Sequence, residues 1–190
     1  MEKVKSGERI TGRVEPQVTK KSAFYEFMES IIVAVLLAVV IRIFIIQPFF
    51  IPSGSMEPTL QVGDRIIVSK FNYHFWSPQR GDIIVFKYPL DPSRDFVKRL
   101  IAFGGETVVL KDSKLYINNR QVPEEYLPAG LHFNDFGPVI VPPGHYLALG
   151  DNRNNSDDSR VWGSLPQKYV VGKAVLVYWP PQRIRLLTGK

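Results

Sequence analysis

The longest apolar stretch of the chain lies near its N-terminus and shows no polar face. Residues 31–41 are all apolar, and between Ile31 and Ile51 only Arg42, Gln47 and Pro48 interrupt the run. A helix buried in a soluble core would carry a polar stripe, whereas a helix of about 20 apolar residues crosses the hydrocarbon core of a bilayer. A cleaved signal peptide has a shorter basic leader and a small-residue cleavage site. The pattern therefore predicts one transmembrane helix over residues 26–47.

Beyond residue 48 the apolar pattern changes to short runs of β-branched and aromatic residues separated by turn residues. Residues 111–114 and Asn118-Asn119 are typical of tight turns, the second because asparagine tolerates a positive φ. Many short strands at this spacing favour an antiparallel sandwich or barrel. The sequence thus predicts an all-β domain over residues 48–190. The expected strands are 65–69, 82–86, 96–102, 107–110, 115–117, 146–149 and 173–178.

The distribution of charge predicts the orientation of the helix. Residues 1–30 contain six Lys or Arg and five Glu, with Lys20 and Lys21 just before the apolar run. By the positive-inside rule, residues 1–25 form a cytoplasmic leader and residues 48–190 an extracytoplasmic domain. The net charge is +6, but no run of five basic residues occurs, so no nucleic-acid site is expected. A basic surface of this kind suits anionic lipid headgroups.

Composition limits the chemistry that the domain can perform. The chain has no cysteine, which excludes disulfides, a thiolate zinc site and a cysteine nucleophile. The three histidines, His74, His132 and His145, are scattered, so neither a metal site nor a cofactor is expected. Any catalysis must therefore use Ser, Lys, Asp and Arg.

The first of three polar clusters covers residues 52–60, just after the predicted helix. Ser53 and Ser55 flank Gly54, and prolines stand on either side. A glycine here would let a substrate backbone approach a serine nucleophile. A plain linker between anchor and domain explains the same composition, and the spacing is not that of a nucleophile elbow.

The second cluster is a lysine inside an apolar strand. By strand alternation Lys98 shares a face with Phe96 and Leu100. If that face is buried, desolvation lowers the lysine pKa and makes a neutral amine available as a base. A surface lysine that protects an edge strand is the alternative interpretation.

The third cluster, residues 150–160, has no apolar side chain. Its acidic residues do not follow the spacing of an EF-hand calcium loop. A solvated loop is one interpretation. The other is a fixed ion pair between Asp158 and Arg160, with the Ser156 hydroxyl beside an active group.

Taken together and in this order, the three clusters resemble one family, the bacterial type I signal peptidases, which are membrane-bound Ser-Lys endopeptidases. The resemblance also includes Gly63-Asp64 and residues 80–86. The chain lacks the large extra domain of some members, and Asn154 replaces a common Asp.

The resemblance implies a role for six polar residues. Ser55 would be the nucleophile and Lys98 its general base, with no histidine relay. The Ser53 hydroxyl and the Ser55 backbone N–H would bind the oxyanion. Ser156 would orient the Lys98 amine, and Asp158 and Arg160 would fix the loop by a salt bridge.

The resemblance also implies a substrate and a location. The family removes signal peptides from exported preproteins after an A-x-A-like site at the outer face of the cytoplasmic membrane. The preprotein would lie along a strand edge. Aromatic residues could dip into the bilayer interface, namely Phe49, Phe50, Phe75 and Trp76. The small side chains would enter apolar pockets lined by Ile51, Met56, Leu60, Phe96 and Val97.

Two other functions compete with this prediction. A soluble Ser-Lys self-cleaving repressor would share the dyad, but the apolar run at 31–46 argues against it. A membrane-tethered β-domain with a binding or structural role would have the same sequence pattern and no hydrolytic activity.

Overall fold

The computed structural model describes residues 23–44, 46–71, 73 and 77–189, and the side chains of 23 and 40–44 are not described. By contacts the chain forms two units, residues 1–38 and 39–190. Helix α1 covers Ala23–Phe44, begins in the first unit and ends in the second, and exposes apolar side chains such as Leu36 and Leu37. Within the described residues, no helix has the length and hydropathy that a membrane crossing requires. The predicted transmembrane helix is therefore not supported by them, and most of the predicted leader, residues 1–22, lies outside them.

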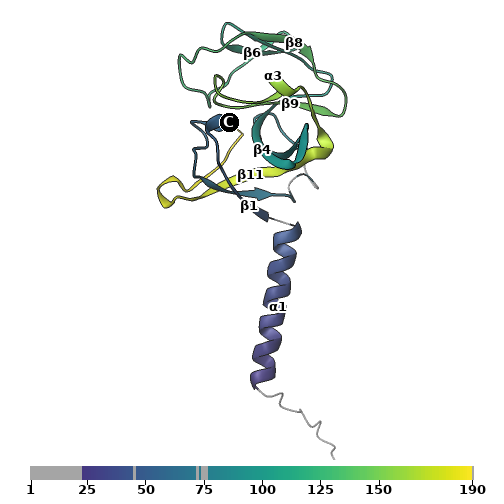
Figure 1. Ribbon diagram of the computed structural model, residues 1–190, viewed down its shortest axis with the longest axis vertical. Helices are drawn as coiled ribbons and strands as arrows, with labels where there is room; N and C mark the ends of the chain where they lie inside the picture. Colours follow the sequence, from purple (N-terminus) through teal and green to yellow (C-terminus); the bar gives the residue numbers. More distant parts are fainter. Residues whose placement is uncertain (1–22, 45, 72, 74–76, 190) are drawn as a thin grey trace, which may run out of the picture. The chain divides into compact units, whose positions relative to one another are not determined.

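The second unit is mostly β-sheet, as predicted, and its larger sheet holds eight strands (Figure 1). Every strand pair in it is antiparallel, so the antiparallel prediction is also confirmed. β12 (Arg185–Leu186) pairs with β11 at the side of the main path. Along that path the strands are β1 (Ile46–Phe50), β2 (Arg65–Ser69), β11 (Val170–Trp179), β3 (Ile83–Tyr88), β4 (Asp91–Phe103), β9 (His145–Leu149) and β10 (Leu165–Pro166).

The smaller sheet has the order β7-β6-β5-β8 and is built around two tight hairpins. Asp112 and Ser113 turn the chain between β5 and β6, and Asn118 and Asn119 turn it between β6 and β7. All four residues have positive φ, which is the backbone of a two-residue hairpin turn. Both predicted turns are thus confirmed. The strands are β5 (Thr107–Lys111), β6 (Lys114–Ile117), β7 (Arg120–Val122) and β8 (Phe136–Ile140).

The seven predicted strands all coincide with observed ones, except that Asp82 precedes β3. Five strands were missed: β1, β7, β8, β10 and β12. β1 begins at Ile46, inside the range 26–47 predicted for the helix. The helical elements whose bounds are described after residue 50 have three or four residues, and they are η1 (Gly54–Met56), α3 (Ser159–Trp162), η2 (Gln167–Tyr169) and η3 (Pro181–Arg183).

A hydrophobic core fixes the serine-containing segment to the larger sheet. Ile51, Met56 and Leu60 are almost fully buried and pack with Ile66 and Val68 of β2. Burying a side chain of this size stabilises the fold by about 1.5–3 kcal/mol. The segment 51–60 is therefore held at both ends and near its middle, which positions Ser53 and Ser55.

Candidate active site

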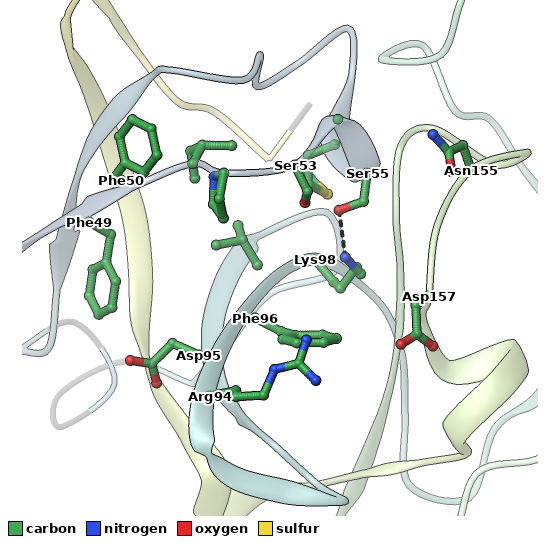
Figure 2. A pocket seen from close by; sticks show the side chains of 15 residues that line it. Phe49, Phe50, Ser53, Ser55, Arg94, Asp95, Phe96, Lys98, Asn155 and Asp157 are labelled. Atoms are coloured by element: carbon green, nitrogen blue, oxygen red, sulfur yellow. Dashed lines mark hydrogen bonds between the residues drawn. The ribbon is translucent and has the colours of Figure 1, made fainter.

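A cavity of about 490 Å³ lies between two walls of the β domain (Figure 2). One wall is residues 49–56, which lead from β1 into η1, and the other is residues 94–98 of β4. Asn155 and Asp157 complete the lining; they belong to residues 150–160, the third cluster, called the polar loop below. The three clusters found in the sequence thus meet at one cavity.

Ser55 occupies the short helix η1 at one end of this cavity. The polar loop contacts its backbone, because the Asn152 N–H donates to the Ser55 carbonyl at 3.1 Å and Asn152 Nδ2 donates to the Gly54 carbonyl at 3.0 Å. Buried Met56 follows directly. Ser53 precedes the helix in an extended conformation, and its side chain forms no capping hydrogen bond. The backbone at Ser55 is therefore fixed from two sides, while the exposed Ser53 hydroxyl can serve a ligand.

Lys98 reaches Ser55 from the opposite wall. Its Nζ lies 2.7 Å from Ser55 Oγ, and the two are hydrogen-bonded (Figure 2). The side chain is buried, and within the described part of the chain the amine has no carboxylate at ion-pair distance. Burial lowers the Lys98 pKa to about 8, although the charges of Asp158, Asp157 and Asp151 act against it. A substantial fraction of Lys98 is thus a neutral amine at mildly alkaline pH.

The polar loop is stiffened by the ion pair between Asp158 and Arg160. Arg160 Nε and Nη2 each donate to the buried Asp158 carboxylate at 2.8 Å, and the Gly150 N–H donates to it at 3.0 Å. Burial raises the Asp158 pKa, but these donors outweigh burial and leave the pKa below its usual value. The loop therefore carries a permanent negative charge close to Lys98.

Ser156 does not make the contact with Lys98 that the sequence analysis expected. Its Oγ is buried and forms no described hydrogen bond with Lys98; the hydroxyl instead acts on the Asp158 carboxylate, whose pKa it helps to lower. It packs against Gly150, where an added Cβ would lie 2.1 Å from Ser156 Oγ and 2.4 Å from the Ser55 carbonyl oxygen. Gly150 thus permits the close approach of the loop to the serine segment.

The predicted pocket residues are brought together with one exception. Ile51, Met56, Phe96 and Val97 line the cavity. Leu60 does not, because it is fully buried in the core among the β2 side chains. Phe49 and Phe50 also line the cavity, whereas Phe75 and Trp76 lie outside the described residues.

The sequence analysis missed a second buried polar network, on the residue next to Lys98. Arg99 donates from Nε and Nη2 to the two oxygens of Asp151 at 2.8 and 2.6 Å, and from Nη1 to the Gly81 carbonyl at 2.8 Å. Thr59 Oγ1 donates to Asp151 at 2.5 Å. The Arg99 guanidinium also stacks on Tyr126, 3.7 Å from the ring centre. Thr59 and Asp151 lie 40 and 52 residues from Arg99 in the chain, so no local pattern links them to it.

A neighbouring pair of buried charges extends this network. Arg153 donates to Glu124, with Nη1 at 2.9 Å from Oε2, and its guanidinium lies over the Phe133 ring. The described residues contain no group of three His, Cys, Asp or Glu side chains that could hold a metal ion. Arg99 and Arg153 are thus each held by an ion pair with a buried carboxylate.

Comparison with known proteins places these features in context. A family model described as signal peptidase, peptidase S26, matches residues 24–179. The chain is 43% identical to signal peptidase I of Leptolyngbya laminosa, covering 86% of this chain and 83% of that protein. It is 39% identical to signal peptidase I of Bacillus licheniformis, covering 90% and 97%. A crystal structure of a signal peptidase I from Enterococcus faecalis is 37% identical, with a TM-score of 0.46 over 52% of this chain and 97% of the other.

Proposed function

The chain belongs to the signal peptidase family, peptidase S26, whose serine peptidases remove signal peptides, and we propose that it cuts with Ser55 as nucleophile and Lys98 as general base. The observation that carries the proposal is the 2.7 Å contact between Lys98 Nζ and Ser55 Oγ. A general base must lie within hydrogen-bond distance of the oxygen whose proton it takes. With a pKa of about 8, the Lys98 amine is also sufficiently often neutral to act.

The proposed reaction has two steps that share one proton carrier. Ser55 Oγ attacks the carbonyl carbon of the scissile bond while its proton moves to Lys98 Nζ. The tetrahedral intermediate collapses when the ammonium returns that proton to the leaving amine, which frees the mature protein and leaves an acyl-enzyme on Ser55. A water molecule, deprotonated by Lys98, then releases the signal peptide as a carboxylic acid and restores the serine hydroxyl.

We assign the oxyanion to the Ser53 hydroxyl and the Ser55 backbone N–H. Both groups belong to the segment that the core fixes, and the Ser53 hydroxyl lines the cavity without forming a capping hydrogen bond. Donors held in place before the reaction stabilise the negative charge that develops on the substrate oxygen. Asp158 and Arg160 act at a distance, because their ion pair holds the loop whose Asn152 fixes the Ser55 carbonyl.

We further propose that the residues before the cut bind as an added strand. In the described structure, residues 91–98 of β4 pair with β3 on one side only, because the pairing with β9 starts at Arg99. β1 pairs with β2 alone and forms the end of the sheet. The cavity lies between these two edges, so an extended preprotein can donate and accept main-chain hydrogen bonds there. Ile51, Met56, Phe96 and Val97 would then contact its small side chains.

The proposed location is the outer face of the cytoplasmic membrane, with residues 26–47 as the anchor. The basic residues before the apolar run support a cytoplasmic N-terminus, and the family match begins at residue 24 and so includes α1. Protease added outside intact cells should digest residues 48–190 and spare the leader. A catalytic domain that stays protected would refute this orientation.

One experiment tests the chemistry directly. A purified preprotein is incubated in detergent with the wild type, Ser55→Ala or Ser53→Ala, and the cleaved fraction is followed over time. We expect no cleavage by Ser55→Ala and a kcat lower by about 10²–10³ for Ser53→Ala with little change in KM. Cleavage by Ser55→Ala at the wild-type rate would exclude this nucleophile. A folded wild type that binds the preprotein without cutting it would instead favour a binding domain.

A further inference from the structure

The cavity has an unpaired positive charge at the end away from the serine. Arg94 lines the cavity, is exposed, and makes no ion pair with any described residue. Its guanidinium stacks instead on two aromatic rings, 5.2 Å from the centre of Phe96 and 5.5 Å from that of Tyr88. Figure 2 shows this guanidinium beside the Phe96 ring. Stacking of this kind orients the charge but does not neutralise it.

The nearby acidic residues have other partners or lie elsewhere. Asp95 forms an ion pair with Lys87 at 2.9 Å. Asp91 accepts hydrogen bonds from the backbone N–H and the hydroxyl of Ser93. Asp157 lines the same cavity, but its charge acts on Lys98 at the catalytic end. Arg94 therefore carries a charge that no described carboxylate contacts, although Asp91 acts on it through space.

The position of Arg94 on β4 defines which part of a preprotein would meet this charge. Arg94, Phe96 and Lys98 alternate on one face of the strand. Strand residues rise about 3.3 Å each, so Arg94 lies about 13 Å before Lys98. A substrate strand whose reacting residue lies at Ser55 and Lys98 would place the third residue before the cut near Phe96 and the fifth near Arg94.

We propose that Arg94 is a specificity-determining residue that favours preproteins with an acidic residue at the fifth position before the cut and disfavours a basic residue there. This proposal rests on the proposed function, because it requires the residues before the cut to lie along β4. Arg94 touches neither Ser55 nor Lys98 in any described contact. It acts on substrate choice and leaves the chemical step unchanged.

The test is a panel of one preprotein with Glu, Gln or Lys at the fifth position before the cut. Its kcat/KM is measured with wild type, Arg94→Gln and Arg94→Glu in an uncharged detergent at low salt. For the wild type we expect kcat/KM to be highest for the Glu substrate, about fivefold lower for Gln, and about fivefold lower again for Lys, as for a partly exposed ion pair. Arg94→Gln should abolish the order and Arg94→Glu should reverse it. Salt should reduce the preference, because it screens exposed charges.

Two controls isolate the effect of this side chain. Arg120→Gln removes the same charge from β7 of the smaller sheet, at an exposed position outside the cavity, and should keep the wild-type order. The same three residues placed at the second position after the cut should give equal rates. Equal cleavage of the Glu, Gln and Lys substrates by the wild type would overturn the proposal for Arg94 while leaving the dyad intact. Loss of all cleavage in Ser55→Ala, measured in parallel, keeps the two questions separate.

Discussion

Lys98 and Arg99 are consecutive buried cations on β4, and the protein surrounds them in opposite ways. Lys98 has a hydroxyl partner and no counter-ion at contact distance, and burial lowers its pKa to about 8. Arg99 makes a two-pronged ion pair with Asp151, donates to the Gly81 carbonyl and stacks on Tyr126. The first arrangement suits the base that we propose and costs stability, because a buried charge without a partner is unfavourable. The second fixes a permanent charge and joins three segments of the chain.

Replacing the amine of Lys98 by a guanidinium, as in its neighbour Arg99, should give the largest loss of activity. A guanidinium stays protonated at any working pH and cannot act as base. We expect Lys98→Arg to lose about 10²–10⁴ in kcat, the usual contribution of general base catalysis. Preprotein cleavage measures it, with circular dichroism to verify folding.

The control for this prediction replaces every conventional alternative base. A variant with His74, His132 and His145 all changed should keep turnover within about an order of magnitude. A folded Lys98→Arg enzyme with substantial turnover, or a folded histidine variant without any, would assign the base to another residue.

Removing the other cation should instead damage stability. Arg99→Met leaves the Asp151 carboxylate buried with only the Thr59 hydroxyl as a described side-chain donor. Breaking a buried ion pair on one side costs about 3–5 kcal/mol, measurable by urea unfolding of the purified protein. The double variant Arg99→Met, Asp151→Leu should recover much of that loss. A midpoint of urea unfolding that is the same for Arg99→Met and the wild type would show that the Arg99–Asp151 pair contributes little to stability.

The same substitution at Lys98, Lys98→Met, should raise the free energy of unfolding, whereas Arg99→Met should lower it. The Lys98 pKa falls from 10.5 to about 8 in the folded protein, which corresponds to about 3 kcal/mol. Below pH 8 both states bind the proton and the folded protein bears this cost in full. Between pH 8 and 10.5 the unfolded state binds more protons, so wild-type stability rises with pH. Lys98→Met should therefore be more stable than the wild type at pH 7 by up to this amount, and the difference should vanish by pH 10.5.

The smallest expected effect concerns the charge that acts on Lys98 through space. Asp157 is exposed, lines the cavity and raises the Lys98 pKa. Asp157→Asn should lower that pKa by about half a unit or less, since solvent screens exposed charges. Activity rises with pH as Lys98 loses its proton, so the midpoint of the pH–rate profile should shift to lower pH. Asp112→Asn, at an exposed turn of the smaller sheet, should leave the midpoint in place.

The strands that the sequence predicted are those whose pattern is local. Short runs of β-branched residues identified β2 and β5, and the asparagine pair identified the turn between β6 and β7. β1 was missed because its residues continue the apolar run of the helix and include Pro48. β8 contains Gly137-Pro138, a pair that is unusual inside a strand, and β10 and β12 have only two residues each.

The candidate site likewise contains residues that the sequence predicted and contacts that it did not. The apolar strand around Lys98 left a buried and a surface lysine both open, and the structure shows the buried one. The resemblance supplied its partner Ser55. The partners of Arg99 could not be read from the sequence, because Asp151 is 52 residues away and alternation alone leaves the surroundings of that face unknown. Leu60 was assigned to the pocket because it is apolar and close to Ser55 in the sequence, but a core position explains both features equally well.

The open edge of β4 also has a consequence for the order in which products leave. In the proposed binding mode, hydrolysis changes one bond, and the cut-off leader would retain all the main-chain groups that pair with the open edge of residues 91–98. The mature protein has no such partners in the groove and departs first. The leader fragment stays bound like a competitive inhibitor, its new carboxylate beside Ser55 and Lys98. We therefore expect turnover to be limited by dissociation of this fragment, and removal of the fragment by a second peptidase to accelerate the enzyme.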